Sequence, residues 1–221
     1  MFRAKKIVDL SLPLTNQTPI YPGDPEPNIS VATTLENEGY NLKHVHLGSQ
    51  TGSHVDAPYH FLNEGETIDQ SDLRLFIGTG IVIPVLDKGE REEIVMEDVE
   101  PYLDQLQAGK VVLFHTGWSR YAGEEKYFNH PYVHIEVINE MIRRGIRTFC
   151  IDCINMDFTG GTSFPVHEAV GAVNGIIAEN LTNFAGIDFD EPLICVFPLR
   201  IIGADGSPVR AVAIEAAGAE R

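Results

Sequence analysis

The chain has little of what disulfide-rich, membrane-spanning and nucleic-acid-binding proteins require. Its 221 residues include three cysteines, too few for a disulfide framework. No apolar run is long enough to cross a membrane. Lys and Arg total 16 against 32 Asp and Glu, and the net charge of −16 opposes binding to a phosphate backbone. We therefore expect neither a membrane nor a nucleic acid as a partner.

The beginning of the chain lacks the features of a secretion signal. Residues 1–9 are basic, but they contain no long apolar stretch and no cleavage site. The composition, 43% hydrophobic and 22% charged, is that of an ordinary globular chain that can bury a core. Internal repeats and long linkers are also missing. We expect residues 1–221 to form a single domain located in the cytoplasm.

Two of the cysteines form a C-x-x-C pair, Cys150 and Cys153. They lie in the segment 148–154, whose apolar residues are typical of a buried strand. A redox pair normally opens a helix, and a zinc ribbon needs a second pair of cysteines. We therefore interpret both as structural thiols.

The apolar pattern predicts alternating strands and helices. Runs rich in Val, Ile and Phe predict strands at 6–12, 80–86, 111–115, 148–154, 193–199 and 209–215. Apolar residues at helical spacing predict helices at 96–106 and 135–144. The first third is richer in strands and turns. The alternation in the second half predicts an α/β domain with some parallel strand pairing.

The segment 50–60 concentrates the residues that point to chemistry. His54 and Asp56 are two apart, so a strand places them on the same face, where both can bind one cation. Imidazole nitrogen and carboxylate oxygen are ligands that suit Zn²⁺ or Mn²⁺. Pro58 interrupts strand pairing and turns the chain. His60 follows this turn and is placed to transfer protons beside the metal.

A second pair of candidate ligands, His167 and Glu179, is separated by twelve residues. On one unbroken helix they would lie about 18 Å apart along the axis, too far to share an ion. The pair Asn174-Gly175 is a strong helix-ending signal between them. We predict a short helix over 165–173 and a returning strand over 176–181, which together bring Glu179 back towards His167. The alternative is that His167 caps the helix and Glu179 faces water.

The segment 50–60 resembles the H-x-G-T-H-x-D-x-P-x-H signature of the cyclase-like metal-dependent hydrolase family. This family includes bacterial kynurenine formamidase and isatin hydrolase. Similar elements occur along most of the chain, at 9–14, 21–25, 116–118 and 179–181. The resemblance implies a swivelling β/β/α fold with a mixed sheet. It also implies metal ligands at His54, Asp56, His167 and Glu179, with Asp56 bridging two ions, and a catalytic role for His60.

Two positions depart from the signature, and Ser53 in place of the usual threonine is the milder change. Gln50 stands where the family usually has its first histidine, and its amide oxygen is a weaker donor than imidazole. Three outcomes stay open. The site holds one ion instead of two, it holds Mn²⁺ with Gln50 as a ligand, or Gln50 leaves the ligand set and orients substrate or water.

A metal site of this kind activates water and polarises a carbonyl, which suits hydrolysis of an amide, formamide, lactam or lactone. Trp118, the only tryptophan, matches a family pocket residue that stacks on a flat ring; its alternative role is core packing. The resemblance also implies a homodimer or higher oligomer. We expect a small-molecule hydrolase, with arylformamidase as one substrate assignment. A non-catalytic protein that binds a metal or ligand is the competing hypothesis.

The remaining histidines offer alternative ligands. His44 and His46 alternate on one strand face, and we interpret them as solvated or substrate-facing because no carboxylate is near in sequence. His130 and His134 are predicted at the surface. The glycine-rich loop 158–164 before His167 is a candidate lid or binding loop.

Overall fold

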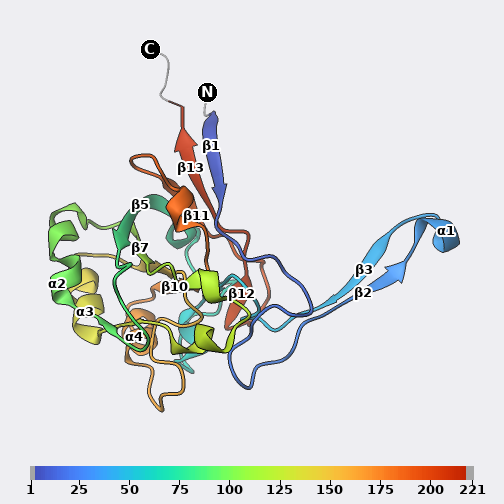
Figure 1. Cartoon of the computed structure of the whole chain (residues 1–221), viewed down its shortest axis with the longest axis horizontal. Coiled ribbons are helices and arrows are strands. Elements are labelled where there is room, and N and C mark those ends of the chain that lie inside the picture. The colour runs from blue at the N-terminus through green and yellow to red at the C-terminus, as the bar shows by residue number, and fades with distance from the viewer. Residues whose placement is uncertain (1–2, 218–221) are drawn as a thin grey trace.

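A nine-stranded mixed sheet forms the centre of the protein in the computed structural model, which describes residues 3–217 (Figure 1). Its strands, in spatial order, are β1 (Ala4–Asp9), β13 (Val212–Ala216), β11 (Leu193–Cys195), β5 (Ile77–Pro84), β7 (Val111–His115), β9 (Thr148–Ile151), β10 (Ile176–Glu179), β4 (His54–Asp56) and β12 (Gly206–Pro208). The pairings β5–β7, β7–β9 and β9–β10 are parallel, and the others are antiparallel. This arrangement confirms the predicted α/β fold with a mixed sheet.

Strand β7 is apolar at successive positions because both of its faces are buried. Val112 and Phe114 point into the larger of two hydrophobic cores, while Val111 and Leu113 point into the smaller core on the opposite face. All four side chains are buried. A strand buried on both faces needs apolar residues at every position, which explains the unbroken run in the sequence.

Helices pack beside this sheet on the side of the larger core. Helix α3 (Ile135–Arg143) buries Val137, Ile138 and Met141 there, and α4 (Pro165–Gly171) packs next to it. Asn174, three residues beyond the end of α4, adopts a left-handed conformation with φ of 52°. The predicted helix end and returning strand are therefore confirmed. None of the helices in residues 3–217 is long and apolar enough to cross a membrane.

The helix predicted over 96–106 is interrupted. The α-helix α2 spans only Met96–Val99, and the 3-10 helix η3 (Glu100–Gln105) continues from it. Pro101 lies at the start of η3, where its ring and missing N–H oppose continuation of an α-helix. The predicted strands at 193–199 and 209–215 are also shorter than expected, since Pro198 and Val209 form only an isolated bridge between β11 and β13.

Short elements complete the described chain. They are α1 (Leu35–Glu38), β2 (Asn28–Thr33), β3 (Leu42–His46), β6 (Glu93–Ile94), β8 (Tyr132–Val133), and the 3-10 helices η1 (Pro58–His60), η2 (Leu73–Phe76), η4 (Trp118–Tyr121), η5 (Glu125–Asn129) and η6 (Phe184–Gly186). Strands β6 and β8 pair in parallel, and β2 and β3 form an antiparallel hairpin.

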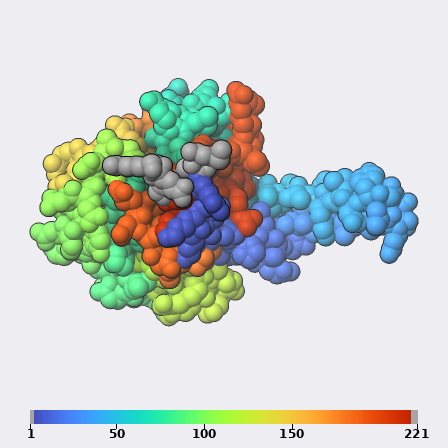
Figure 2. Space-filling view, turned by 90° about the horizontal axis from the view of Figure 1, so that it is seen from above, coloured from blue at the N-terminus to red at the C-terminus, as the bar shows by residue number. Residues whose placement is uncertain are grey.

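The β2–β3 hairpin and α1 form an arm that projects away from the rest of the protein (Figures 1 and 2). Its side chains are largely exposed, including those of Val31 and Val45. His44 and His46 are also exposed on β3, so the interpretation of these two residues as solvated is confirmed. They contribute nothing to the candidate site described below.

Candidate metal centre

Strand β4 supplies the first two candidate ligands from the interior of the sheet. His54 and Asp56 lie on the same face of β4, and Glu179 on β10 lies directly opposite His54. Residues opposite each other on paired strands project side by side. The sheet register therefore brings His54, Asp56 and Glu179 together, and all three side chains are buried.

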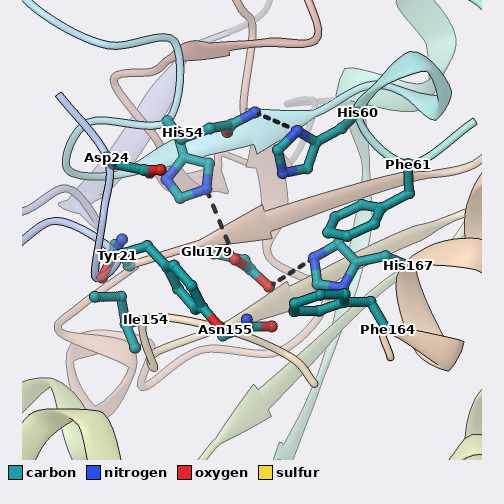
Figure 3. A pocket seen from close by; sticks show the side chains of 12 residues that line it. Tyr21, Asp24, His54, His60, Phe61, Ile154, Asn155, Phe164, His167 and Glu179 are labelled. Carbon is teal, nitrogen blue, oxygen red and sulfur yellow. Dashed lines mark hydrogen bonds and ion pairs between the residues drawn. The ribbon is translucent and has the colours of Figure 1, made fainter. Parts of the chain in front are cut away.

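The donor atoms of these side chains converge. His54 Nε2 lies 3.4 Å from Asp56 Oδ1 and 3.7 Å from Glu179 Oε2. Ligand atoms from His54, Asp56 and Glu179 all lie within 4.8 Å of one another (Figure 3). This spacing is compatible with binding of one cation between them.

His167 approaches the same two carboxylates from helix α4. Its Nε2 lies 3.3 Å from Asp56 Oδ2 and 3.3 Å from Glu179 Oε1. Each carboxylate thus turns one oxygen to His54 and the other to His167. The alternative in which His167 only caps a helix and Glu179 faces water is wrong, because both side chains are buried and face each other.

Hydrogen bonds fix the orientation of both imidazoles. The Nδ1 of His167 lies 2.7 Å from Asp157 Oδ2, and the Nδ1 of His54 lies 2.8 Å from the carbonyl oxygen of Gly52. Asp157 also accepts bonds from the backbone N–H groups of Val166 and His167. With Nδ1 engaged in this way, Nε2 of each ring is left to face the carboxylates, as metal-ligating histidines require.

The electrostatics of the cluster favour a cation. Burial opposes charge on His54, but Asp56 and Glu179 outweigh it and raise the pKa of His54 to about 10. Burial likewise opposes charge on His167, while Glu179 and Asp157 hold its pKa well above the usual range. The two carboxylates thus draw positive charge into the cluster. A divalent ion supplies that charge and leaves the imidazoles neutral, as ligands must be.

The chemistry of the donor set fits a divalent metal. Both oxygens of Asp56 are buried without a hydrogen-bond partner in residues 3–217. Unpaired buried carboxylate oxygens are costly unless a cation binds them. The residues present therefore fit a metal held by His54, Asp56, His167 and Glu179.

His60 lies beyond the turn at Pro58, at the end of η1. Its side chain is 30% exposed and lines the same cavity as His54 and His167. Its Nδ1 lies 3.1 Å from Asp205 Oδ2, and its other ring nitrogen faces the cavity (Figure 3). Although burial lowers the pKa of His60, Asp205 and Asp56 raise it above the ordinary value. The position suits a proton-transfer group beside the metal cluster.

Gln50 lines the same cavity. Its Nε2 donates to Asp205 Oδ2 over 2.7 Å. Its Oε1 is buried and has no hydrogen-bond partner among the described residues. The amide nitrogen is thus engaged by Asp205 while Oε1 is free to bind an ion, a water or the substrate, so the three outcomes left open by the sequence stay predictions.

The cavity beside the cluster has a volume of about 170 Å³. Its wall combines aromatic and aliphatic side chains with three amides and the carboxylate of Asp24. The lining residues beyond the cluster are Tyr21, Asp24, Gln50, His60, Phe61, Ile154, Asn155, Phe164 and Asn180. Phe164 ends the predicted binding loop 158–164, so this loop contributes to the wall; its movement as a lid stays a prediction.

Trp118 is not brought to this cavity. It is 2% exposed in the larger hydrophobic core, and its Nε1 donates to the carbonyl oxygen of Lys126. The structure therefore supports its alternative role, core packing.

The surface prediction for His130 is wrong, since its buried ring lies 2.7 Å from Thr159 Oγ1. His134 is partly exposed and caps α3. Cys150 and Cys153 are buried free thiols, as predicted.

Three acidic residues of the site were missed by sequence reasoning. Asp157 orients His167, Asp205 contacts His60 and Gln50, and Asp24 lines the cavity. Asp24 belongs to the segment 21–25, which resembles the family, and this resemblance was the signal that could have identified it. Asp157 and Asp205 lie ten and 145 residues from the histidines that they contact, and neither has a local pattern that identifies it.

Comparison with known proteins identifies relatives of similar sequence and fold. The kynurenine formamidase of Bacillus cytotoxicus is 28% identical over 212 residues, which cover 95% of this chain and 98% of that protein. An isatin hydrolase bound to the product analogue thioisatinate has the same fold, with a TM-score of 0.88 at 21% identity over 95% of this chain and 92% of the other. A structure described as a potential metal-dependent hydrolase with cyclase activity gives 0.77 at 23% identity, covering 95% and 97%.

A family model adds evidence that is independent of these pairwise likenesses. Residues 8–158 match the model named Cyclase and described as "Putative cyclase". The match includes the segment that carries His54, Asp56 and His60. It covers more than half of the 221 residues. The chain therefore belongs to the Cyclase family.

Proposed function

We propose that the protein is a divalent-metal-dependent hydrolase that cleaves a carbon–nitrogen bond in a small linear or cyclic amide. The observation that carries the proposal is the buried convergence of His54, Asp56, His167 and Glu179 beside His60 and a cavity. Curated relatives named kynurenine formamidase support the reaction class. When bound, the metal would polarise the substrate carbonyl and activate water.

Other residues of the site would transfer protons, bind the substrate and exclude bulk water. His60 takes a proton from the attacking water through its cavity-facing nitrogen and returns it to the leaving nitrogen. Asn155 and Asn180 are two of the three amides of the wall and can hydrogen-bond the substrate. The surrounding buried side chains limit access of bulk water to the reacting groups.

The cavity wall favours a substrate with a flat ring. Phe61 and Phe164 lie with ring centroids 4.8 Å apart at the cavity, and Tyr21 and Ile154 complete an apolar surface. Aromatic substrates gain both area burial and ring stacking on such a wall. This observation favours an aryl formamide, such as N-formylkynurenine, within the broader amide class.

A substrate panel tests the proposed reaction. We expect the metal-loaded protein to hydrolyse aryl formamides or aryl lactams faster than aliphatic formamides and lactones of similar size. Initial rates, measured at equal substrate concentration with a metal-only blank, give the comparison. Absence of turnover on every member, together with tight metal binding, would support the competing hypothesis of a non-catalytic binding protein.

The metal that we propose is Zn²⁺ or Mn²⁺, since two imidazoles and two carboxylates suit both ions. We expect fewer than two tightly held ions per chain after dialysis. Two dications would share only the two negative charges of Asp56 and Glu179, and Gln50 adds no charge and is turned towards Asp205. Elemental analysis of the dialysed protein measures the ratio. Two retained ions per chain would contradict this reading of Gln50.

Gln50→His provides the matched comparison. An imidazole at the cavity edge is a stronger donor than the amide, so this variant should retain more metal than the unmodified protein. Both proteins are dialysed side by side against the same trace metal. An unchanged ratio with lower activity would mean that Gln50 acts through hydrogen bonds alone.

We also propose that the protein is a homodimer or higher oligomer located in the cytoplasm. The arm supports the assembly, because Ile29, Val31 and Val45 share one face of a hairpin that projects from the body, with Lys43 as the charged residue of that face (Figure 2). Val31 and Val45 are 58% and 54% exposed. A two-stranded hairpin is only marginally stable without cover, and a second copy of the chain would provide it.

Light scattering tests the assembly. We expect a mass of at least twice the 24.4 kDa of one chain, and a single-chain mass at working concentration would rule the assembly out. Combining Val31→Glu with Val45→Glu should shift the protein towards monomer, because charge is then buried in the contact. The pair Ser30→Glu and His44→Glu, on the opposite face of the arm, is the control and should leave the mass unchanged.

A further inference from the structure

We propose that Asp205 is a positioning residue that holds His60 in the tautomer with its proton on Nδ1, leaving Nε2 free to accept a proton in the cavity. Gln50 is the second donor to the same carboxylate and stabilises it in place. The inference rests on the proposed hydrolase function. It concerns a residue far from the metal-binding segments in sequence.

The contacts of Asp205 support the proposed tautomer. Asp205 Oδ2 lies 3.1 Å from His60 Nδ1 and 2.7 Å from Gln50 Nε2. An ionised carboxylate oxygen can only accept, so the 3.1 Å contact of Asp205 with His60 is favourable when Nδ1 carries a hydrogen. Gln50 Nε2 lies 3.4 Å from the same Nδ1 and would donate to it in the opposite tautomer; the shorter contact with the charged oxygen of Asp205 favours the Nδ1–H form. With its proton on Nδ1, neutral His60 has an unprotonated Nε2.

The carboxylate of Asp205 is held at both oxygens. Ser49 Oγ donates to Oδ1 over 2.8 Å, while Oδ2 takes the bonds described above. Hydrogen bonding, led by that of His60, keeps the pKa of Asp205 well below its usual range, so the group stays ionised. An ionised, fully engaged carboxylate is a fixed acceptor for the imidazole.

The backbone ties this group to the strand that carries the metal ligands. The carbonyl oxygen of Asp205 accepts the N–H of Ala57, which directly follows Asp56. Gly206, the next residue, pairs with Asp56 in the sheet. Asp205 thus connects His60 to the strand that carries His54 and Asp56. This connection sets the position of His60 relative to the cluster.

Gly206 also makes room for Gln50. A Cβ atom at position 206 would lie 2.6 Å from Gln50 Nε2 and 2.6 Å from the carbonyl oxygen of Val55. Glycine thus permits the amide to lie flat against the strand and reach Asp205. Gln50, at the position where the family signature has histidine, is in this way part of the support for His60.

The variants Asp205→Asn and Asp205→Ala test the proposal. An asparagine amide can donate to Nδ1 and stabilise the opposite tautomer, so kcat should fall by roughly 10²- to 10⁴-fold. KM and metal content should stay near those of the unmodified protein. Asp205→Ala removes the acceptor without imposing the wrong tautomer and should be impaired no more than Asp205→Asn. Ser49→Ala, which removes one outer bond, is the mild control.

Two readouts separate positioning from a general structural role. In a His60→Ala background, Asp205→Asn should cost little more activity, since the two residues act through one path. Nitrogen NMR of labelled imidazoles, with His60→Ala to assign the signal, should show His60 protonated on Nδ1 in the unmodified protein and on Nε2 in Asp205→Asn. The NMR result stands even if no substrate is turned over, so it separates this proposal from the proposed function.

Equal activity of Asp205→Asn and the unmodified protein would overturn the proposal. The proposal would also be overturned if Asp205→Asn lowered activity as much in the His60→Ala background as it does alone. An Nε2–H tautomer of His60 in the unmodified protein would overturn it as well. The tautomer of the unmodified protein and the effect of Ser49→Ala remain informative if the Asp205 variants fail to fold.

Discussion

Asp56→Ala is expected to remove both the bound metal and all measurable amide hydrolysis. The oxygens of Asp56 face both histidines, with Oδ1 3.4 Å from His54 Nε2 and Oδ2 3.3 Å from His167 Nε2. Its loss leaves Glu179 as the sole carboxylate between them. Elemental analysis and initial rates of the same preparation measure both effects.

The stability of this variant gives a control against misfolding. Although burial opposes its charge, His167 and His54 hold the pKa of Asp56 well below its usual range, so the carboxylate is stabilised in the metal-free protein. Asp56→Ala should therefore unfold at a somewhat lower temperature than the chelator-stripped unmodified protein, while its far-UV circular dichroism spectrum stays that of the folded protein. Asp56→Asn, which keeps the shape and loses the charge, should behave similarly. Full metal occupancy in either variant would refute the ligand assignment.

His60→Ala is expected to keep the metal and lose kcat by roughly two to four orders of magnitude, the usual effect of removing an acid–base group. His60 lies beside the cluster, and its Nδ1 is engaged by Asp205. The donor set of His54, Asp56, His167 and Glu179 does not include it. Metal content and kcat are measured together.

His46→Ala, on the exposed arm, is the matched control and should change neither quantity. If His60→Ala loses metal and activity together, His60 is a ligand and the assigned role is incorrect. A loss of activity through KM alone would instead assign it to substrate binding.

The sequence was most informative where local chemistry determines structure. Asn174-Gly175 ended α4 as predicted, because Asn174 adopts the left-handed conformation that terminates helices. The two-residue spacing of His54 and Asp56 likewise determined their shared face. These local signals, joined by the resemblance, predicted all four residues of the cluster.

Features that depend on long-range packing were not predictable in this way. Asp205 reaches His60 only because β12 pairs with β4, and no local pattern in its segment indicates that pairing. Trp118 was assigned by resemblance to the pocket, but packing against the larger core determines its position. Pro101 was a local signal against a continuous helix, and it was outweighed by the apolar periodicity around it.

The central claim is that this buried cluster holds the divalent ion on which amide hydrolysis depends. Titrating Zn²⁺ or Mn²⁺ into chelator-stripped protein, while recording bound metal and the rate on an aryl formamide, tests it most directly. We predict no turnover by the stripped protein, and a rate that rises in proportion to bound metal until the cluster is filled. Full turnover by protein shown to contain no metal would contradict the account.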